Sequence, residues 1–296
     1  MLRVIAYLAS AALGLGFLLY PQANAWNQER TFAATSAAFR EQSAAVSPAT
    51  TSEIIAAAQE YNRHLTEQPA AAYPPEAAET DADYQAQLRI NDTPLMGEVL
   101  IPAINVRLPL SHGTSEEALA TGAGHVYGSS LPVGGPGTHA VISAHAEVNR
   151  AERFTNLDQL VIGDEFFIFA GGQMLRYQVD QIKVVLPDDL SDLQVVPDQD
   201  YVTLLTCTPK GINSHRLLVR GVRVPNVVAE PVMAGTPFPW WAVWYVGGLG
   251  AAGIYSGLLN RKRKPVAVDA VVATASLAAD IPVVVEFTGA GQGESR

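Results

Sequence analysis

Two long uncharged segments frame the chain and limit what it can fold into. Residues 4–20 contain no charged side chain, and residues 240–259 form a second apolar run. A helix of 20 residues covers about 30 Å, which is the thickness of the hydrocarbon core of a bilayer. This pattern predicts a folded region held between two membrane segments. The alternative for the second run is a buried core helix.

The residues beside the first run predict export of the chain that follows it. Arg3 precedes the run, and the small residues Ala23 and Ala25 flank Asn24, as in a signal-peptidase site. Residues 1–25 are therefore either a cleaved signal or a short membrane anchor. Both alternatives place the following chain outside the cytoplasm.

The second run has the flanks of a transmembrane helix. Trp240, Trp241 and Trp244 lie at its start, and the basic run 261–264 closes it. Tryptophans are enriched at membrane interfaces, and clusters of Lys and Arg stay in the cytoplasm. We therefore predict a transmembrane helix over 240–259 and a basic, cytoplasmic tail over 260–296.

Composition excludes several classes of function. The net charge of −10 argues against a surface that neutralises nucleic-acid phosphates. Cys207 is the one cysteine, which excludes an intrachain disulfide and a Cys-rich zinc site. We expect no metal and no organic cofactor.

Between the two apolar runs, the amino-acid composition changes along the chain. Residues 26–68 are predicted to be helical, 69–95 to form a Pro-rich acidic loop, 96–228 to form a β domain, and 229–239 to be a linker. Short apolar runs punctuated by Gly and Pro are typical of a barrel or sandwich. Gly122, Gly124 and the pair 134–135 are predicted to be turn glycines. The predicted strands are 96–101, 107–110, 138–143, 165–169, 175–186, 201–206 and 216–224.

Cys207 lies at the end of a predicted strand, just before Pro209, which cannot continue a ladder. Arg216 opens the next strand. If these strands pair as a hairpin, both side chains lie at one end of the sheet, where a guanidinium favours a thiolate or binds an oxyanion. The alternatives are a structural thiol and a surface salt bridge.

A cysteine nucleophile needs a partner for proton transfer. His145 follows the apolar run 140–144, and is therefore also at a strand end. This placement favours it only modestly over the other histidines, because a lone histidine is more often structural. The others are His64, His112, His125, His139 and His215.

The run Thr203-Leu-Leu-Thr-Cys207 resembles the Thr-Leu-x-Thr-Cys signature of sortases, the cysteine transpeptidases of Gram-positive surfaces. Over residues 96–224 the chain is similar to class C, the pilin-polymerising branch. Besides the signature, the resemblance rests on Met96-Gly-Glu-Val-Leu-Ile-Pro102, Leu108-Pro-Leu-Ser-His-Gly-Thr-Ser115, Ser129-Ser-Leu-Pro-Val-Gly-Gly135 and Cys207-Thr-Pro-Lys-Gly-Ile-Asn-Ser-His-Arg216-Leu-Leu-Val-Arg-Gly221.

This resemblance implies an eight-stranded sortase β-barrel, with helices before it and membrane segments on both sides. It implies Cys207 as nucleophile, His145 as general acid and base, and Arg216 as the binder of oxyanion and substrate. Thr206 and Thr208, which flank the cysteine, are expected to support the substrate cleft.

The implied partners are pilins or surface proteins with a C-terminal sorting signal. The implied reaction cuts a Leu-Pro-x-Thr-Gly-like signal after Thr, leaving an acyl-thioester that a pilin lysine resolves. The alternatives are a housekeeping-type sortase with a peptidoglycan-precursor amine as acceptor, a hydrolytic cysteine peptidase and a non-catalytic envelope scaffold.

Class C sortases often have a lid with an Asp-Pro-aromatic motif over the cleft. This chain has no Asp-Pro dipeptide, and the nearest equivalent is Tyr73-Pro74 in the acidic loop. We expect Tyr73 and Pro74 to act as a lid over Cys207. The alternative is a disordered acidic linker.

Overall fold

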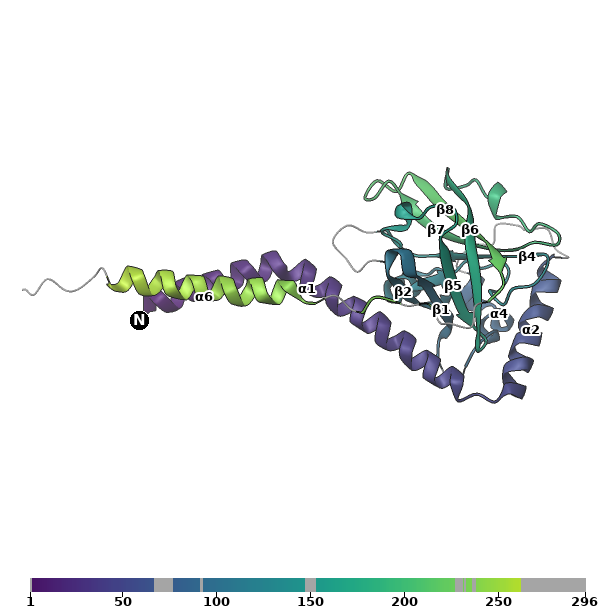
Figure 1. Cartoon of the computed structure of the whole chain (residues 1–296), viewed down its shortest axis with the longest axis horizontal. Helices are drawn as coiled ribbons and strands as arrows, with labels where there is room; N and C mark the ends of the chain where they lie inside the picture. Colours follow the sequence, from purple (N-terminus) through teal and green to yellow (C-terminus); the bar gives the residue numbers. More distant parts are fainter. Residues whose placement is uncertain are drawn as a thin grey trace, which may run out of the picture. The chain divides into compact units, whose positions relative to one another are not determined.

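The structure, a computed structural model, contains a closed barrel of eight strands (Figure 1). The structure describes residues 2–66, 77–90, 93–146, 153–226, 231, 233–235 and 238–261. The strand order is β1-β2-β3-β4-β7-β8-β6-β5. The pairs β2/β3 and β4/β7 are parallel, and the other pairs are antiparallel. The strands are β1 (Leu95–Ile101), β2 (Val106–His112), β3 (Ala123–His125), β4 (Thr138–Ser143), β5 (Glu165–Ala170), β6 (Gln173–Val185), β7 (Asp200–Thr208) and β8 (His215–Val224).

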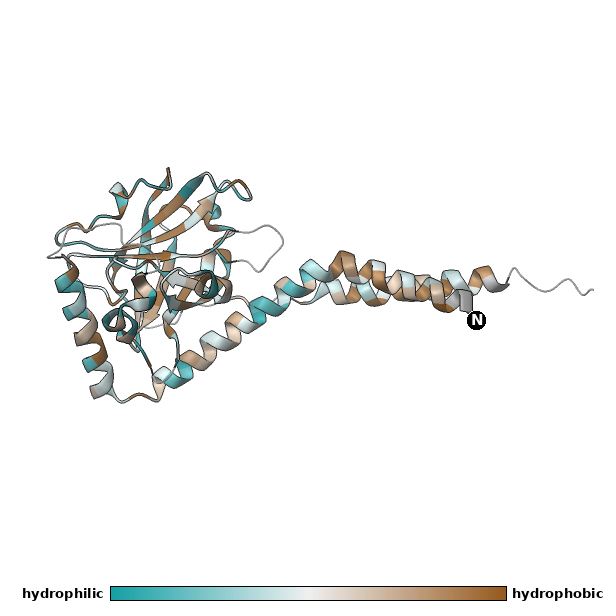
Figure 2. Ribbon diagram, turned by 180° about the vertical axis from the view of Figure 1, so that it is seen from behind, coloured by the Kyte–Doolittle hydropathy of each residue, from teal (hydrophilic) through white to brown (hydrophobic). Residues whose placement is uncertain are grey.

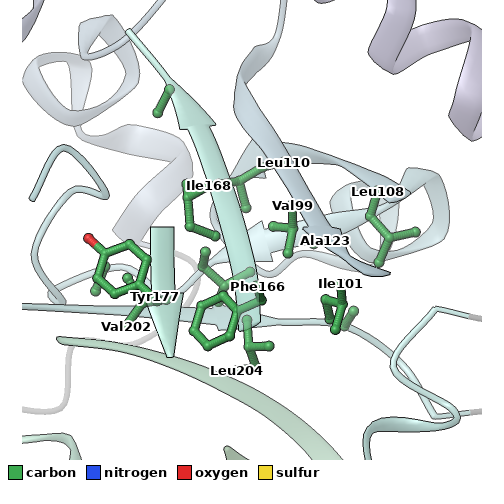
Figure 3. Close-up of a cluster of buried hydrophobic side chains, with 14 of the residues drawn as sticks. Val99, Ile101, Leu108, Leu110, Ala123, Phe166, Ile168, Tyr177, Val202 and Leu204 are labelled. Carbon is green, nitrogen blue, oxygen red and sulfur yellow. The ribbon is translucent and has the colours of Figure 1, made fainter. Parts of the chain in front are cut away.

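The strands enclose a core of branched and aromatic side chains (Figure 3). Side chains alternate between the faces of a strand, so every second residue enters the barrel. Val99 and Ile101 of β1, for example, meet Leu108 of β2 inside it. The predicted eight-stranded barrel is confirmed, and each of the seven strands predicted from apolar runs is present with slightly different ends.

The eighth strand, β3, corrects the expectation that Gly124 is a turn glycine, whereas Gly122 lies at the bend that ends the helix Glu116–Thr121. Gly124 lies within β3, opposite Ser111 of β2. A Cβ at Gly124 would lie 2.2 Å from the carbonyl oxygen of Gly113, so the two segments approach closely only because that side chain is missing. The expectation does hold at Gly134 and Gly135, which both have positive φ.

Two helices precede the barrel, and the predicted helical region 26–68 contains the end of the first and the whole of the second. Helix α1 (Leu2–Ala44) is continuous with the first apolar run, and α2 (Pro48–Thr66) follows. Helix α2 begins at Pro48, because proline is favoured in the first turn of a helix, although Pro21 lies inside α1. Ser47 accepts a hydrogen bond from the Thr50 amide at 3.2 Å and so caps α2.

The acidic segment before β1 is partly helical, so its interpretation as a loop is wrong for residues 77–86. It contains α3 (Ala77–Thr80) and α4 (Ala82–Ala86). Asp81 caps α4 by accepting the Tyr84 amide at 3.0 Å. Tyr84 is fully buried, and its hydroxyl accepts the Gly113 amide at 2.9 Å. Tyr84 therefore helps to anchor the segment to the barrel, together with the hydrogen bond between His112 and the Gln87 carbonyl.

Helix α1 covers the outer face of β1, all of whose residues are buried. Glu98 on that face is fully buried and accepts a hydrogen bond from Arg40 of α1. Arg107 of β2 lies 3.6 Å from the other carboxylate oxygen. Next to this cluster, Phe39 of α1 packs edge-on against Phe169 of β5. A buried carboxylate needs such cations, so α1 is joined to the barrel by charge as well as by apolar contact.

The remaining elements are short, apart from α6 (Trp240–Arg261). They are α5 (Glu116–Thr121) and the 3₁₀ turns η1 (Pro102–Ile104), η2 (Leu157–Gln159) and η3 (Ser191–Leu193). Both α1 and α6 are long and apolar enough to cross a membrane, over candidate spans Ile5–Ala44 and Trp240–Leu259. Figure 2 shows hydrophobic residues along most of α6 and along the first part of α1.

Candidate active site

Three neighbouring strands bring the predicted catalytic residues to one end of the barrel. β4, β7 and β8 are adjacent in the sheet (Figure 1). His145 follows β4, Cys207 lies at the end of β7, and Arg216 lies at the start of β8. Cys207 and Arg216 flank one hairpin turn, whereas His145 is far from both in sequence and reaches them through the pairing of β4 with β7.

Cys207 and Arg216 are direct cross-strand partners, so the predicted hairpin is present. Opposed residues of an antiparallel pair have Cβ atoms about 5 Å apart. Both side chains are half-buried. The Arg216 guanidinium donates to the carbonyl oxygens of Asn213 and His215, each at 3.2 Å, which holds it at the mouth of the hairpin.

His145 lies level with Cys207 because β4 and β7 run parallel and in register. Ser143 is paired with Leu205, and two residues further along each segment are His145 and Cys207. The Ala144 amide continues the ladder by donating to the Leu205 carbonyl at 3.2 Å. The His145 side chain is 27% exposed, with its Nε2 3.9 Å from Oε2 of Glu116.

The two threonines beside Cys207 differ in burial and in their contacts. Thr206 is buried, and its hydroxyl donates to the carbonyl oxygen of Ala144 at 2.7 Å. It therefore fastens the strand of the cysteine to the residue before His145. Thr208 is half-buried and pairs with His215 across the hairpin.

Three other histidines are buried within the fold, and hydrogen bonds to neighbouring residues hold their rings. His125 engages the Tyr84 hydroxyl and the Ser130 carbonyl, at 2.9 and 2.8 Å. His139 engages the Gln194 carbonyl and the Thr203 hydroxyl, at 2.9 and 2.7 Å. The Nε2 of His112 lies 2.8 Å from the Gln87 carbonyl.

Burial disfavours the charged form of these imidazoles. It lowers the pKa of His125 to about 4, and it also lowers the pKa of His112 and of His139. His64 lies on α2 beside Glu60. His215 lies in the hairpin of Cys207, opposite Thr208, but side chains alternate along a strand, so its ring is on the other face from Arg216, and it bonds to Ser214. The geometry therefore separates His145 from the other five, which the sequence pattern did only weakly.

Sequence reasoning missed Glu116, which lies near the imidazole of His145. Glu116 is the first residue of α5 and follows the cap Ser115, whose side chain accepts the Ala118 amide. This sequence pattern marks a helix start but does not point to a histidine. Within the part of the chain that the structure describes, no three His, Cys, Asp or Glu residues are grouped to hold a metal ion.

The predicted lid residues Tyr73 and Pro74 lie outside the described residues. Their proposed closure over Cys207 stays a prediction from sequence. The described part of the same segment, residues 77–90, contacts the barrel through Tyr84.

Comparison with known proteins identifies the family. Residues 99–224 match the sortase domain model. A crystal structure of Streptococcus agalactiae sortase C1 is 44% identical with a TM-score of 0.61, covering 66% of this chain and 99% of that one. A Streptococcus pneumoniae sortase C is 41% identical with a TM-score of 0.60, covering 66% and 99%. Bacillus anthracis sortase A is 28% identical over 138 residues, which are 46% of this chain and 63% of that protein.

The chain therefore belongs to the sortase family, whose members are cysteine transpeptidases. Both of these Streptococcus structures, at 44% and 41% identity, are of sortases C. It spans less than two thirds of the length of the Bacillus anthracis relative.

Proposed function

We propose that this chain is a class C-type sortase that cleaves a Leu-Pro-x-Thr-Gly-like sorting signal after Thr and joins the acyl group to a lysine amine. The observation that carries the proposal is the adjacency of His145, Cys207 and Arg216 on β4, β7 and β8. A nucleophile, a proton carrier and a fixed cation are the parts that acyl transfer through a thioester needs.

In the first half-reaction the Cys207 thiolate attacks the Thr carbonyl carbon and a C–S bond forms. Arg216, opposite Cys207, donates to the oxygen that becomes negative. The Thr–Gly C–N bond then breaks, and His145 protonates the leaving glycine amine. The acyl group remains on sulfur as a thioester.

In the second half-reaction an acceptor amine attacks the thioester carbonyl, loses a proton to His145 and releases the Cys207 thiolate. Acceptor positioning lets an amine compete with water. We assign this role to a pilin lysine because the similar Streptococcus pneumoniae sortase C is described with pilin substrate specificity. A peptidoglycan amine is the competing acceptor.

We also propose that the barrel lies outside the cytoplasm between two membrane-spanning helices. Helix α1 is 43 residues long, or about 65 Å at 1.5 Å per residue, so it exceeds one hydrocarbon thickness. Its apolar first part spans the membrane and its remainder reaches the barrel. The exposed Trp240 and Trp244 lie at the interface where α6 enters. The C-terminal tail is then cytoplasmic.

The test is cleavage of a sorting-signal peptide by the full chain in detergent micelles or nanodiscs. Mass spectrometry should find cleavage between Thr and Gly, and an acyl adduct on Cys207. With a lysine-bearing pilin peptide and a peptidoglycan-type amine in equal amounts, the lysine product should predominate. Cleavage without an adduct, or transfer only to the peptidoglycan-type amine, would contradict the proposal.

A further inference from the structure

Arg153 is a buried cation close in sequence to the strand end that bears His145. Its side chain is almost fully buried. The guanidinium donates to the carbonyl oxygen of Ala120 at 2.9 Å and lies 5.6 Å from the centre of the Phe32 ring. Burying a guanidinium is costly unless such contacts compensate, and these contacts also hold it in one position.

The residue after Arg153 contacts the backbone of His145. Phe154 is fully buried in the core, and its amide donates to the carbonyl oxygen of His145 at 3.1 Å. A shift of Arg153 therefore moves the donor that fixes the main chain at His145.

Helix α5 completes a ring of contacts around the same histidine. Ala120, which accepts from Arg153, is in the last turn of α5, and Glu116 is its first residue. Glu116 Oε2 lies 3.9 Å from Nε2 of His145. Arg153 thus touches the end of the helix whose start faces the imidazole.

We infer that Arg153 is a positioning residue for His145, acting through the Phe154 amide and through α5. This inference rests on the proposed role of His145 in proton transfer. Such transfer needs heavy atoms about 2.6–3.2 Å apart, and a misplacement of about 1 Å can cost 100-fold in rate. Phe32 belongs to α1, so the helix that we propose to be membrane-bound also contacts Arg153.

The test is Arg153→Leu in the full chain, with Arg153→Lys beside it. Arg153→Leu should lower kcat/KM for Thr–Gly cleavage by about 10- to 100-fold, mainly through kcat. It should also move the pH profile of Cys207 alkylation by a small thiol reagent by at least half a unit. Arg153→Lys keeps a charge near Phe32 and one N–H donor, so it should recover part of the rate.

Arg223→Leu is the matched control. Arg223 also lies near an aromatic ring, 5.7 Å from the centre of Tyr177, and donates to a carbonyl oxygen, that of Arg176 at 3.1 Å. It is at the far end of β8 from Arg216. We expect it to lower the melting temperature while leaving kcat/KM and the alkylation profile within twofold of wild type.

Glu116→Gln covers the case in which Arg153→Leu does not fold. Glu116 is 95% exposed, so its replacement should not impair folding. It should move the alkylation profile, because it removes the carboxylate that faces the imidazole. An unchanged profile in Glu116→Gln would overturn the link between α5 and His145 on which the inference depends. A folded Arg153→Leu that behaves as Arg223→Leu does would overturn the inference itself.

A separate variant distinguishes this failure from failure of the proposed function. If His145→Ala keeps normal cleavage, the assignment of His145 is wrong and Arg153 has nothing to position. If His145→Ala is inactive while Arg153→Leu is normal, only the positioning role is wrong.

Discussion

His125 and His145 both lie at the ends of strands, yet they differ in burial and in hydrogen bonding. His125, at the end of β3, is fully buried and bonded through both ring nitrogens to the Tyr84 hydroxyl and the Ser130 carbonyl. His145, just after β4, is partly exposed at the end of the barrel where Cys207 lies. A ring with both nitrogens engaged inside a core stabilises that core, whereas the His145 ring is partly exposed at the end of the barrel, where we propose that it transfers a proton.

The residues around His125 and those around Cys207 also differ in their contacts. Around His125, Tyr84 links the segment before β1 to the Gly113 backbone, and Tyr127 donates to Asp81 at 2.6 Å. Around Cys207, the contacts of Thr206 and of the Arg216 guanidinium are to the backbone. The contacts around His125 join separate segments of the fold, and the contacts around Cys207 hold side chains at the end of the barrel. Variants in the two regions should therefore divide into those that lose stability and those that lose turnover.

The largest effect is expected at the thiol. Cys207→Ala should abolish both signal cleavage and polymer formation, because removing one member of a catalytic unit costs several orders of magnitude in rate. The fold should remain, since the side chain is small and half-buried. Peptide cleavage measures the loss of activity, and thermal unfolding measures whether the fold remains. Polymer formation near the wild-type level would refute the assignment.

Replacement of histidines tests the comparison directly. His145→Ala should reduce cleavage about 10²- to 10⁴-fold, the range of a lost general acid and base, with a melting temperature close to wild type. His64→Ala should leave turnover unchanged, and His112→Ala should alter stability but not the chemistry. An active His145→Ala together with an inactive His125→Ala or His139→Ala would show that a different histidine transfers the proton.

A smaller loss, about 10²- to 10³-fold in kcat, is expected for Arg216→Ala, as for removal of one oxyanion donor. Arg216→Lys should restore little, because the planar pair of donors is lost. Arg220→Ala is the control on the same strand: Arg220 bonds to Asp180, and its loss should leave turnover near wild type. Equal losses at both arginines would mean that β8 had been disturbed as a whole.

The buried region should show itself in the pH dependence of stability. The pKa of His125 is about 4 in the folded chain, against about 6.5 when unfolded. The unfolded chain therefore binds more protons between these values, so the free energy of unfolding is highest above pH 6.5 and falls as the pH drops towards 4. The full loss is about 3 kcal/mol at 1.36 kcal/mol per unit.

Denaturant unfolding at pH 7, 6, 5 and 4 measures this slope, with His125→Gln as the comparison. The variant should be less stable at pH 7 and should show a flatter dependence. Equal slopes in the two proteins would place the acid sensitivity in other groups. The lowered pKa values of His112 and His139 act in the same direction and will remain in the variant.

Local sequence patterns alone determined much of this protein. Apolar runs bounded by Gly and Pro located seven strands, because burial inside a barrel imposes that pattern on each strand independently. Cys207 and Arg216 could be paired in advance, since a short turn between two strands brings its flanks together. Length and hydropathy likewise marked the two candidate spans.

Only the tertiary structure decided how distant segments meet. β3 is three residues long, too short to show alternation, and it exists because Gly124 lets it pair with β2. Glu98 is charged, and only its contacts with Arg40 and Arg107 explain its burial. The strand pattern did not separate His145 from the other histidines; the family resemblance implied it, and the pairing of β4 with β7 places it level with Cys207. The physical reason is common to these cases: the energy lies in contacts between residues far apart in the chain, which no local pattern encodes.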